Sequence, residues 1–279
     1  MKLTELGKAD RHKYSSLSLG NKLKLCKTII QHSLKRFKSA DLATAATGGK
    51  DSTLMLWLIK QVVEKEKLVF PQVVFIDEGD VFEETKKFIN NLAKDWRFKL
   101  SVTHNHDLSS KVRKIGDMVK VADLNSINRK ELKKLGFKGE KFAFEAESLI
   151  GNHLMKTVAL NMWLKANKKK VLFVGVRWDE QETRSKDDFF RQVDFPKHCR
   201  VEPILHVSEK EVWQIIHDKE IPFVSLYQRG YRSLGAKTTT NKSSNKPAWE
   251  QDFKKTAERS GRQQDKEQIM EKLRSLGYM

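Results

Sequence analysis

The residues best suited to chemistry form one short run, TGGKDS, at positions 47–52. Two adjacent glycines let backbone N–H groups approach a ligand closely, and a helix that begins near Ser52 would point its positive end at the same place. Lys50 adds a mobile cation, and Ser52 adds a hydroxyl at the helix start. The run therefore predicts a cradle for a di- or triphosphate. It differs from the Walker loop, G-x-x-x-x-G-K-[ST], because its glycines immediately precede the lysine.

Two other stretches place polar residues at the ends of apolar runs. Asp77 follows VVFI, where an acidic group can accept hydrogen bonds from a ribose. Arg177 and Arg184 follow VLFVGV, and guanidinium groups hold anions through paired hydrogen bonds. We expect Asp77 to contact a nucleoside and the two arginines to contact an anionic group. An ordinary strand-end turn and a salt-bridged loop are the structural alternatives.

The elements that must position these residues are visible in the hydrophobic pattern. Apolar runs predict strands at 41–47, 68–77, 98–105 and 171–176. Helical spacing predicts helices at 52–66, 82–96 and 148–167. Strands that alternate with helices indicate an α/β fold with a doubly wound, mainly parallel sheet. Ligands of such sheets bind at the carboxyl ends of the strands, which is where the residues above fall.

The 279 residues suit one large α/β domain with additions at both ends. Residues 1–40 are a basic helical N-terminal segment, with an amphipathic helix expected at 22–38. A phosphate-binding α/β domain is predicted over 41–234, with a lysine-rich insertion near 110–147. Residues 235–279 contain few apolar side chains at first, and we expect a flexible loop followed by a C-terminal tail.

The formal net charge of +18 invites a nucleic-acid interpretation, but lysine and arginine are spread along the whole chain. A solvated lysine-rich surface and a preference for phosphate-bearing small molecules explain the charge better, so we expect no nucleic-acid partner. No apolar run is long enough to span a bilayer, and the start MKLTELGKADRHK lacks the apolar stretch of a secretion signal. We therefore expect a cytoplasmic protein without a membrane partner.

The chain has two cysteines, Cys26 and Cys199, far apart and without metal-ligand spacing. This scarcity argues against a disulfide framework and against a zinc site. We predict no metal site built from protein side chains alone.

The run at 47–52 resembles the pyrophosphate loop, S-G-G-x-D-S, of the ATP pyrophosphatase superfamily, with Thr47 in place of the first serine. The stretch from Asp77 resembles D-T-G-x-x-F-x-E, with Glu78 in place of the threonine, and the stretch from Gly175 resembles G-x-R-x-D-E-x-x-x-R. Both motifs are similar to those of the family that contains phosphoadenosine phosphosulfate reductases and the nucleotide-binding subunit of sulfate adenylyltransferase. The resemblance implies a Rossmann-like fold of the adenine nucleotide alpha hydrolase type.

Within that family, the reductases need a thiol nucleophile after an S-I-G block or in a C-terminal tail. Here Ser233-Leu234-Gly235 is followed by AKTT, and no cysteine lies beyond Cys199. The run ERSGR at 258–262 also resembles the end of the adenylyltransferase subunit. The resemblance therefore favours adenylyl transfer from ATP to sulfate with release of pyrophosphate. It implies ATP and sulfate as small-molecule substrates, Mg²⁺ as cofactor, and a GTPase partner subunit.

The predicted site has two groups of residues. The expected catalytic residues are Lys50, Arg177 and Arg184. The expected nucleotide-binding residues are Thr47, Gly48, Gly49, Asp51, Ser52, Asp77 and Gly79. Two alternatives stay open: an enzyme that adenylates a tRNA base, and a non-catalytic nucleotide binder of the reductase family that lacks the catalytic cysteine.

Overall fold

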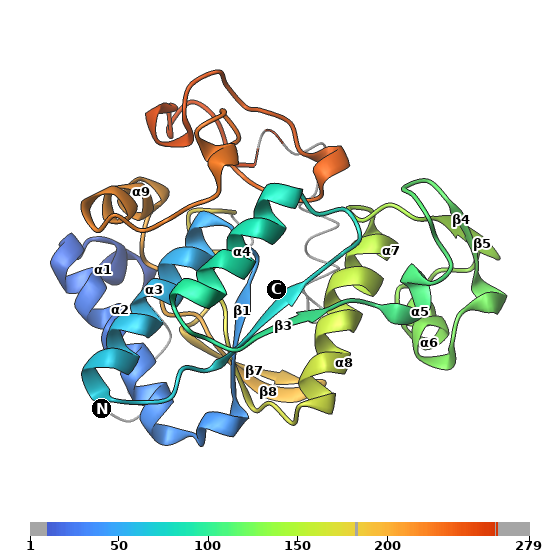
Figure 1. The fold of residues 1–279 in the computed structure, drawn as a ribbon, viewed down its shortest axis with the longest axis horizontal. Helices are drawn as coiled ribbons and strands as arrows, with labels where there is room; N and C mark the ends of the chain where they lie inside the picture. The colour runs from blue at the N-terminus through green and yellow to red at the C-terminus, as the bar shows by residue number, and fades with distance from the viewer. Residues whose placement is uncertain (1–9, 182–183, 260, 262–279) are drawn as a thin grey trace.

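A computed structural model describes residues 10–181, 184–259 and 261. Its centre is a six-stranded sheet in the order β3-β2-β1-β6-β8-β7, parallel except for β7, which pairs antiparallel with β8. The strands are β1 (Leu42–Ala46), β2 (Gln72–Ile76), β3 (Leu100–Thr103), β6 (Val171–Phe173), β7 (Phe190–Asp194) and β8 (Lys197–Val201). The mainly parallel, Rossmann-like sheet with flanking helices confirms the predicted fold class (Figure 1). The strands β7 and β8 are not among the elements expected from the sequence.

The central strand β1 is buried along its whole length, as its small and apolar residues predict. Thr44 pairs with Val73 on one side and with Phe173 on the other, which brings the ends of β1, β2 and β6 together. The helices that flank the sheet are α2 (Leu19–Arg36), α3 (Lys50–Glu66), α4 (Glu83–Asp95), α8 (Ala159–Ala166) and α9 (Glu209–Asp218). Within the described residues, no helix has the length and apolar content needed to cross a bilayer.

The smaller elements lie mostly in connections. The α-helices among them are α1 (Arg11–Ser15), α5 (His106–Ser109), α6 (Ser126–Lys134) and α7 (Leu149–Gly151). A π-helix covers Asn152–Val158 and joins α7 to α8, so the predicted helix at 148–167 contains a π segment. Short 3₁₀ turns cover Ser39–Asp41, Val121–Asp123, Ser225–Tyr227, Lys237–Thr239 and Ala248–Glu250.

The insertion expected near 110–147 is a small lobe with a core of its own, set to one side of the sheet (Figure 1). It contains α6 and a two-stranded antiparallel sheet of β4 (Met118–Lys120) and β5 (Lys141–Ala143). Its buried Leu132 and Phe142 pack in one cluster with Leu154 of the π-helix. The lobe is therefore attached to the helix that carries Lys156 toward the sheet edge.

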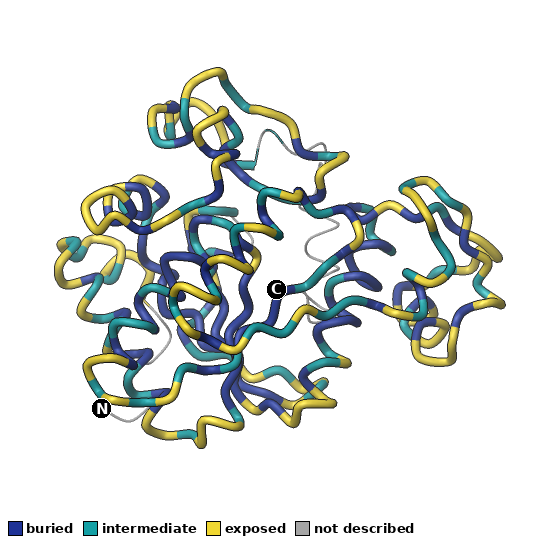
Figure 2. Tube along the Cα trace, in the orientation of Figure 1, coloured by how far each residue is buried: buried dark blue, intermediate teal, exposed yellow. Residues whose placement is uncertain are grey.

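The segments on either side of the α/β domain are a helix near the N-terminus and an irregular stretch after residue 234. The helix α2 begins after the N-cap Ser18 and packs its apolar face, including Cys26 and Ile29, into the main core, as the amphipathic pattern predicts. Residues 1–9 lie outside the described part. The segment 235–259, expected as a flexible loop, is mostly irregular, and its residues Ala236 and Ala248 are fully buried. Buried positions recur along this otherwise exposed segment (Figure 2).

Candidate functional site

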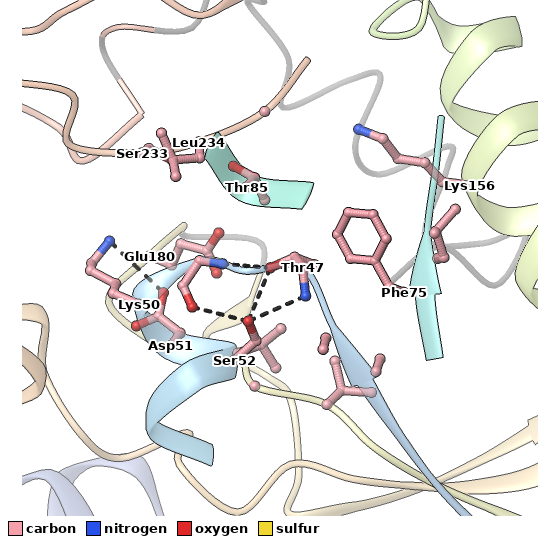
Figure 3. A pocket seen from close by; sticks show the side chains of 18 of the residues that line it. Thr47, Lys50, Asp51, Ser52, Phe75, Thr85, Lys156, Glu180, Ser233 and Leu234 are labelled. Carbon is pink, nitrogen blue, oxygen red and sulfur yellow. Dashed lines mark hydrogen bonds and ion pairs between the residues drawn. The ribbon is translucent and has the colours of Figure 1, made fainter. Parts of the chain in front are cut away.

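A cavity of about 190 Å³ lies at the carboxyl ends of β1, β2 and β6. The walls come from the loop at 47–52, the end of β2, the π-helix, the residues after β6, and the segments 233–235 and 258–259. Figure 3 shows these side chains converging from several elements on the start of α3. The fold thus brings the expected phosphate loop to the edge where parallel sheets bind ligands.

The loop between β1 and α3 is a tight turn braced by its own hydroxyls. Gly48 has a φ of +74°, and a Cβ at this position would lie 2.6 Å from Thr85 Cγ2. Both the backbone conformation and the lack of space therefore favour glycine here. Ser52 Oγ donates to the carbonyl of Gly49 at 3.0 Å and lies 3.2 Å from Thr47 Oγ1 (Figure 3). The helix begins at Lys50, two residues before the expected start, with Gly49 as N-cap.

Lys50 is buried among carboxylates. Its Nζ lies 2.5 Å from Glu258 Oε1, 3.7 Å from Glu209 Oε1 and 3.9 Å from Asp51 Oδ2. Burial alone would lower the pKa of Lys50, but Glu258 and Asp51 outweigh that effect and raise it. Lys50 is therefore a permanent cation in this structure.

Arg177 lies beneath the same loop and is fully buried. Its Nε donates to Asp51 Oδ1 at 2.7 Å, its Nη1 donates to Asp179 Oδ1 at 2.5 Å, and its Nη2 donates to Glu258 Oε2. Arg177 is absent from the cavity walls, so the structure places it behind Asp51 and Glu258, both of which line the cavity. Two of the three expected catalytic residues, Lys50 and Arg177, thus meet at Glu258.

The carboxylates of this cluster have shifted proton affinities. Burial raises the pKa of Asp51 to about 6, although Arg177 and Lys50 oppose the shift. Burial would also raise the pKa of Glu258, but Arg177 and Lys50 outweigh it and hold that pKa well below the usual range. Glu258 therefore favours its ionised form more strongly than Asp51 does.

Arg184, the third expected catalytic residue, lines the cavity. Its Nε lies 3.3 Å from Glu180 Oε2, and Arg259 Nη1 lies 3.2 Å from Glu180 Oε1. Glu180 thus gathers two guanidinium groups at the cavity wall. This pairing matches the salt-bridged loop that the sequence allows, and anion binding by Arg184 stays a prediction.

The end of β2 differs from the expectation that Asp77 faces the nucleoside. Asp77 Oδ1 accepts from the backbone N–H of Gly79 at 3.0 Å, and Oδ2 pairs with Lys86 Nζ at 3.2 Å. Neither Asp77 nor Gly79 lines the cavity, whereas the adjacent Glu78 does. Glu78 Oε2 lies 2.6 Å from Lys156 Nζ, which also reaches Glu147 Oε1 at 2.8 Å. Side chains alternate across an extended segment, so Asp77 and Glu78 point to opposite sides.

Several residues of the site have no assigned role in the sequence analysis. Tyr227 is buried and its hydroxyl accepts from the backbone N–H of Lys50 at 3.0 Å. Thr85 and Thr157 line the cavity, and their buried hydroxyls have no hydrogen-bond partner among the described residues. In the sequence, Glu258 stands out only as the first residue of ERSGR. Within the described chain, no group of three or more histidine, cysteine, aspartate or glutamate side chains could hold a metal ion.

Comparison with known families and sequences gives a consistent result. Residues 41–242 match the family described as the phosphoadenosine phosphosulfate reductase domain. An adenosine 5'-phosphosulfate reductase from Geobacillus sp. (strain WCH70) is 23% identical over 223 residues, which cover 79% of this chain and 81% of that protein. Sulfate adenylyltransferase subunit 2 from Sulfurovum sp. (strain NBC37-1) is 28% identical over 202 residues. That match covers 64% of this chain but only 57% of the relative.

Solved structures share the fold at low sequence identity. A phosphoadenylyl-sulfate reductase from Candida auris superposes with a TM-score of 0.55 at 16% identity, covering 81% of this chain and 98% of that one. An FMN adenylyltransferase from Candida glabrata gives a TM-score of 0.58 at 16% identity, covering 86% of this chain and 74% of that one. Both therefore support the fold rather than a particular reaction.

Proposed function

The chain belongs to the phosphoadenosine phosphosulfate reductase domain family, and from this premise we propose that it transfers the adenylyl group of ATP to sulfate. The products are adenylyl sulfate and pyrophosphate. The observation that carries the proposal is the meeting of two buried cations, Lys50 and Arg177, at the positive end of α3. Such a group of charges neutralises a departing pyrophosphate or an incoming oxyanion.

The two thiols support transfer over reduction. Cys26 packs in the main core on α2, and Cys199 lies on β8, and neither lines the cavity. Burial raises the pKa of both thiols, which opposes formation of the thiolate that a reductase needs. A nucleophilic cysteine is therefore a poor fit to this site.

In the proposed reaction, a sulfate oxygen attacks the α-phosphorus of ATP, and the bond from that phosphorus to the bridging oxygen of the β-phosphate breaks. The helix start at Lys50 and the hydroxyl of Ser52 hold the leaving pyrophosphate. Arg184 at the cavity wall and Arg177 behind it add positive charge that offsets the charge of the bound anions. The unpartnered hydroxyls of Thr85 and Thr157 are available to the nucleoside.

Mg²⁺ bound to substrate phosphates needs only one or two protein carboxylates, since phosphate and water supply its other oxygens. Asp51 and Glu180 both line the cavity, so the residues present fit this requirement. When bound, the ion would neutralise phosphate charge. We also propose a GTP-hydrolysing partner for the forward direction, since the phosphate–sulfate anhydride is a less stable bond than the one broken in ATP.

The test is ATP formation from adenylyl sulfate and pyrophosphate with Mg²⁺, the downhill direction. Wild type should make ATP, and Lys50→Ala should lose about 100-fold or more of that rate. Lys60→Ala is the matched control, because Lys60 is on the same helix but pairs at the surface with Glu64. Absence of ATP in wild type, with or without a GTPase partner, would turn the assignment toward a tRNA-directed or non-catalytic role.

A further inference from the structure

One carboxylate serves both buried cations of the site. Glu258 Oε1 lies 2.5 Å from Lys50 Nζ, and Glu258 Oε2 accepts from Arg177 Nη2. The exposed fractions of the three side chains are 5%, 2% and 0% for Glu258, Lys50 and Arg177. A carboxylate that offers one oxygen to each of two donors has the same contact pattern as an oxyanion of sulfate or phosphate.

We propose that Lys50 and Arg177 form a single oxyanion subsite, and that Glu258 fills it as an internal anion that the substrate displaces. The inference rests on the proposed function and names the end of the cavity that binds the substrate's oxyanion. It departs from the sequence-based assignment, in which Lys50 and Arg177 serve different groups. The structure instead brings their donor atoms to the two oxygens of one carboxylate.

The charges of the cluster explain why Glu258 must leave. Five cations, which belong to Lys50, Arg177, Arg184, Arg232 and Arg259, face five carboxylates, which belong to Asp51, Asp179, Glu180, Glu209 and Glu258. The cluster is therefore balanced while Glu258 is in place. A sulfate or pyrophosphate that entered without displacing Glu258 would add negative charge to this buried cluster and compete for the same two donors. Such an addition is strongly unfavourable in a site with little water. Removal of Glu258 offsets part of the incoming charge and frees the two donors.

The residues next to Glu258 make few apolar contacts. Residues 254–257 are all exposed, so Glu258 is the buried anchor of an otherwise solvated stretch. The segment is held mainly by polar contacts: Arg232 Nη1 donates to the carbonyl and the hydroxyl of Thr256, and Arg259 pairs with Glu180. Segments with few apolar contacts open at low free-energy cost. Glu209, in contrast, is fixed on α9 and paired with Arg232.

The test is calorimetric binding of inorganic pyrophosphate, and separately of sulfate, to the full chain and to Glu258→Gln. When Glu258 occupies the subsite in most molecules, the apparent affinity is the intrinsic affinity multiplied by the fraction of molecules whose subsite is open. Removal of the internal anion should therefore tighten binding about tenfold. The same variant should unfold at a lower temperature without ligand and gain a larger shift with pyrophosphate. Glu250→Gln is the matched control, because it removes the same charge from an exposed position nearby and should bind as wild type does.

Unchanged or weaker binding by Glu258→Gln would overturn the proposal and make Glu258 a structural counter-ion. If that variant does not fold, Glu258→Asp replaces it, because the shorter acid keeps the charge but cannot span both donors. It should still bind pyrophosphate more tightly than wild type, and equal or weaker binding would refute the subsite. Binding needs no turnover: tighter binding without ATP formation in any variant would reject sulfate transfer and keep the subsite.

Discussion

The substitution Gly175→Ala tests how closely the chain just after β6 approaches the start of α3. A Cβ at position 175 would lie 2.9 Å from the carbonyl oxygen of Asp51 and 2.9 Å from Ser52 Cα. Both neighbours are backbone atoms, so neither can rotate away. Since carbon contacts are favourable near 3.5 Å, the strand end or the helix start must move by about 0.5 Å. Overpacking of this kind costs about 1–3 kcal/mol of the free energy of unfolding.

The same shift moves the phosphate loop relative to the rest of the cavity. A displacement of about 1 Å can lower a rate about 100-fold. A displacement of about half that length should therefore lower the rate of ATP formation about tenfold. Urea unfolding and the ATP-forming assay measure the two effects. Gly20→Ala is the control, since a Cβ there meets nothing within 4 Å and should leave the rate unchanged. If Gly175→Ala has the stability and the rate of the wild type, the close approach is refuted. If it loses stability but keeps the full rate, the close approach stands, but it does not position the phosphate loop.

Two further predictions concern groups outside the cavity. Burial lowers the pKa of His206 to about 4, with Lys22 and Glu211 close by, so the unfolded chain takes up a proton below about pH 6.5 while the folded protein does not. Stability from this group is therefore present above pH 6.5 and lost as pH falls, by about 2 kcal/mol between pH 7 and pH 5. Urea unfolding of His206→Gln should lack that part of the pH dependence, and an identical dependence would contradict the assignment. Cys199→Ala should keep ATP formation within about twofold, because the thiol is outside the cavity, and a large loss would point to thiol chemistry.

The phosphate loop and the sheet around it could be predicted because their signals are local. A small-residue strand, two glycines and a helical apolar pattern lie within 26 consecutive residues, from Asp41 to Glu66, and each of them limits the backbone directly. The strands β7 and β8 carry no such signal. Their residues are FRQVD and KHCRV, and β8 buries Arg200 beside Glu202 rather than presenting an apolar run. A buried ion pair of this kind is invisible in a hydrophobicity pattern.

Some features of the site could also be predicted from local sequence, and others depend on tertiary packing. The sequence by itself determined the type of each residue near the cavity and placed the phosphate loop directly before a helix. Only the tertiary structure decided that Glu78 rather than Asp77 lines the cavity, because one step along an extended chain reverses a side chain. It also decided that Glu258 lies between Lys50 and Arg177, a contact across 208 positions of sequence. Charges that far apart meet only when packing brings their segments together, and no spacing rule in the sequence encodes that distance.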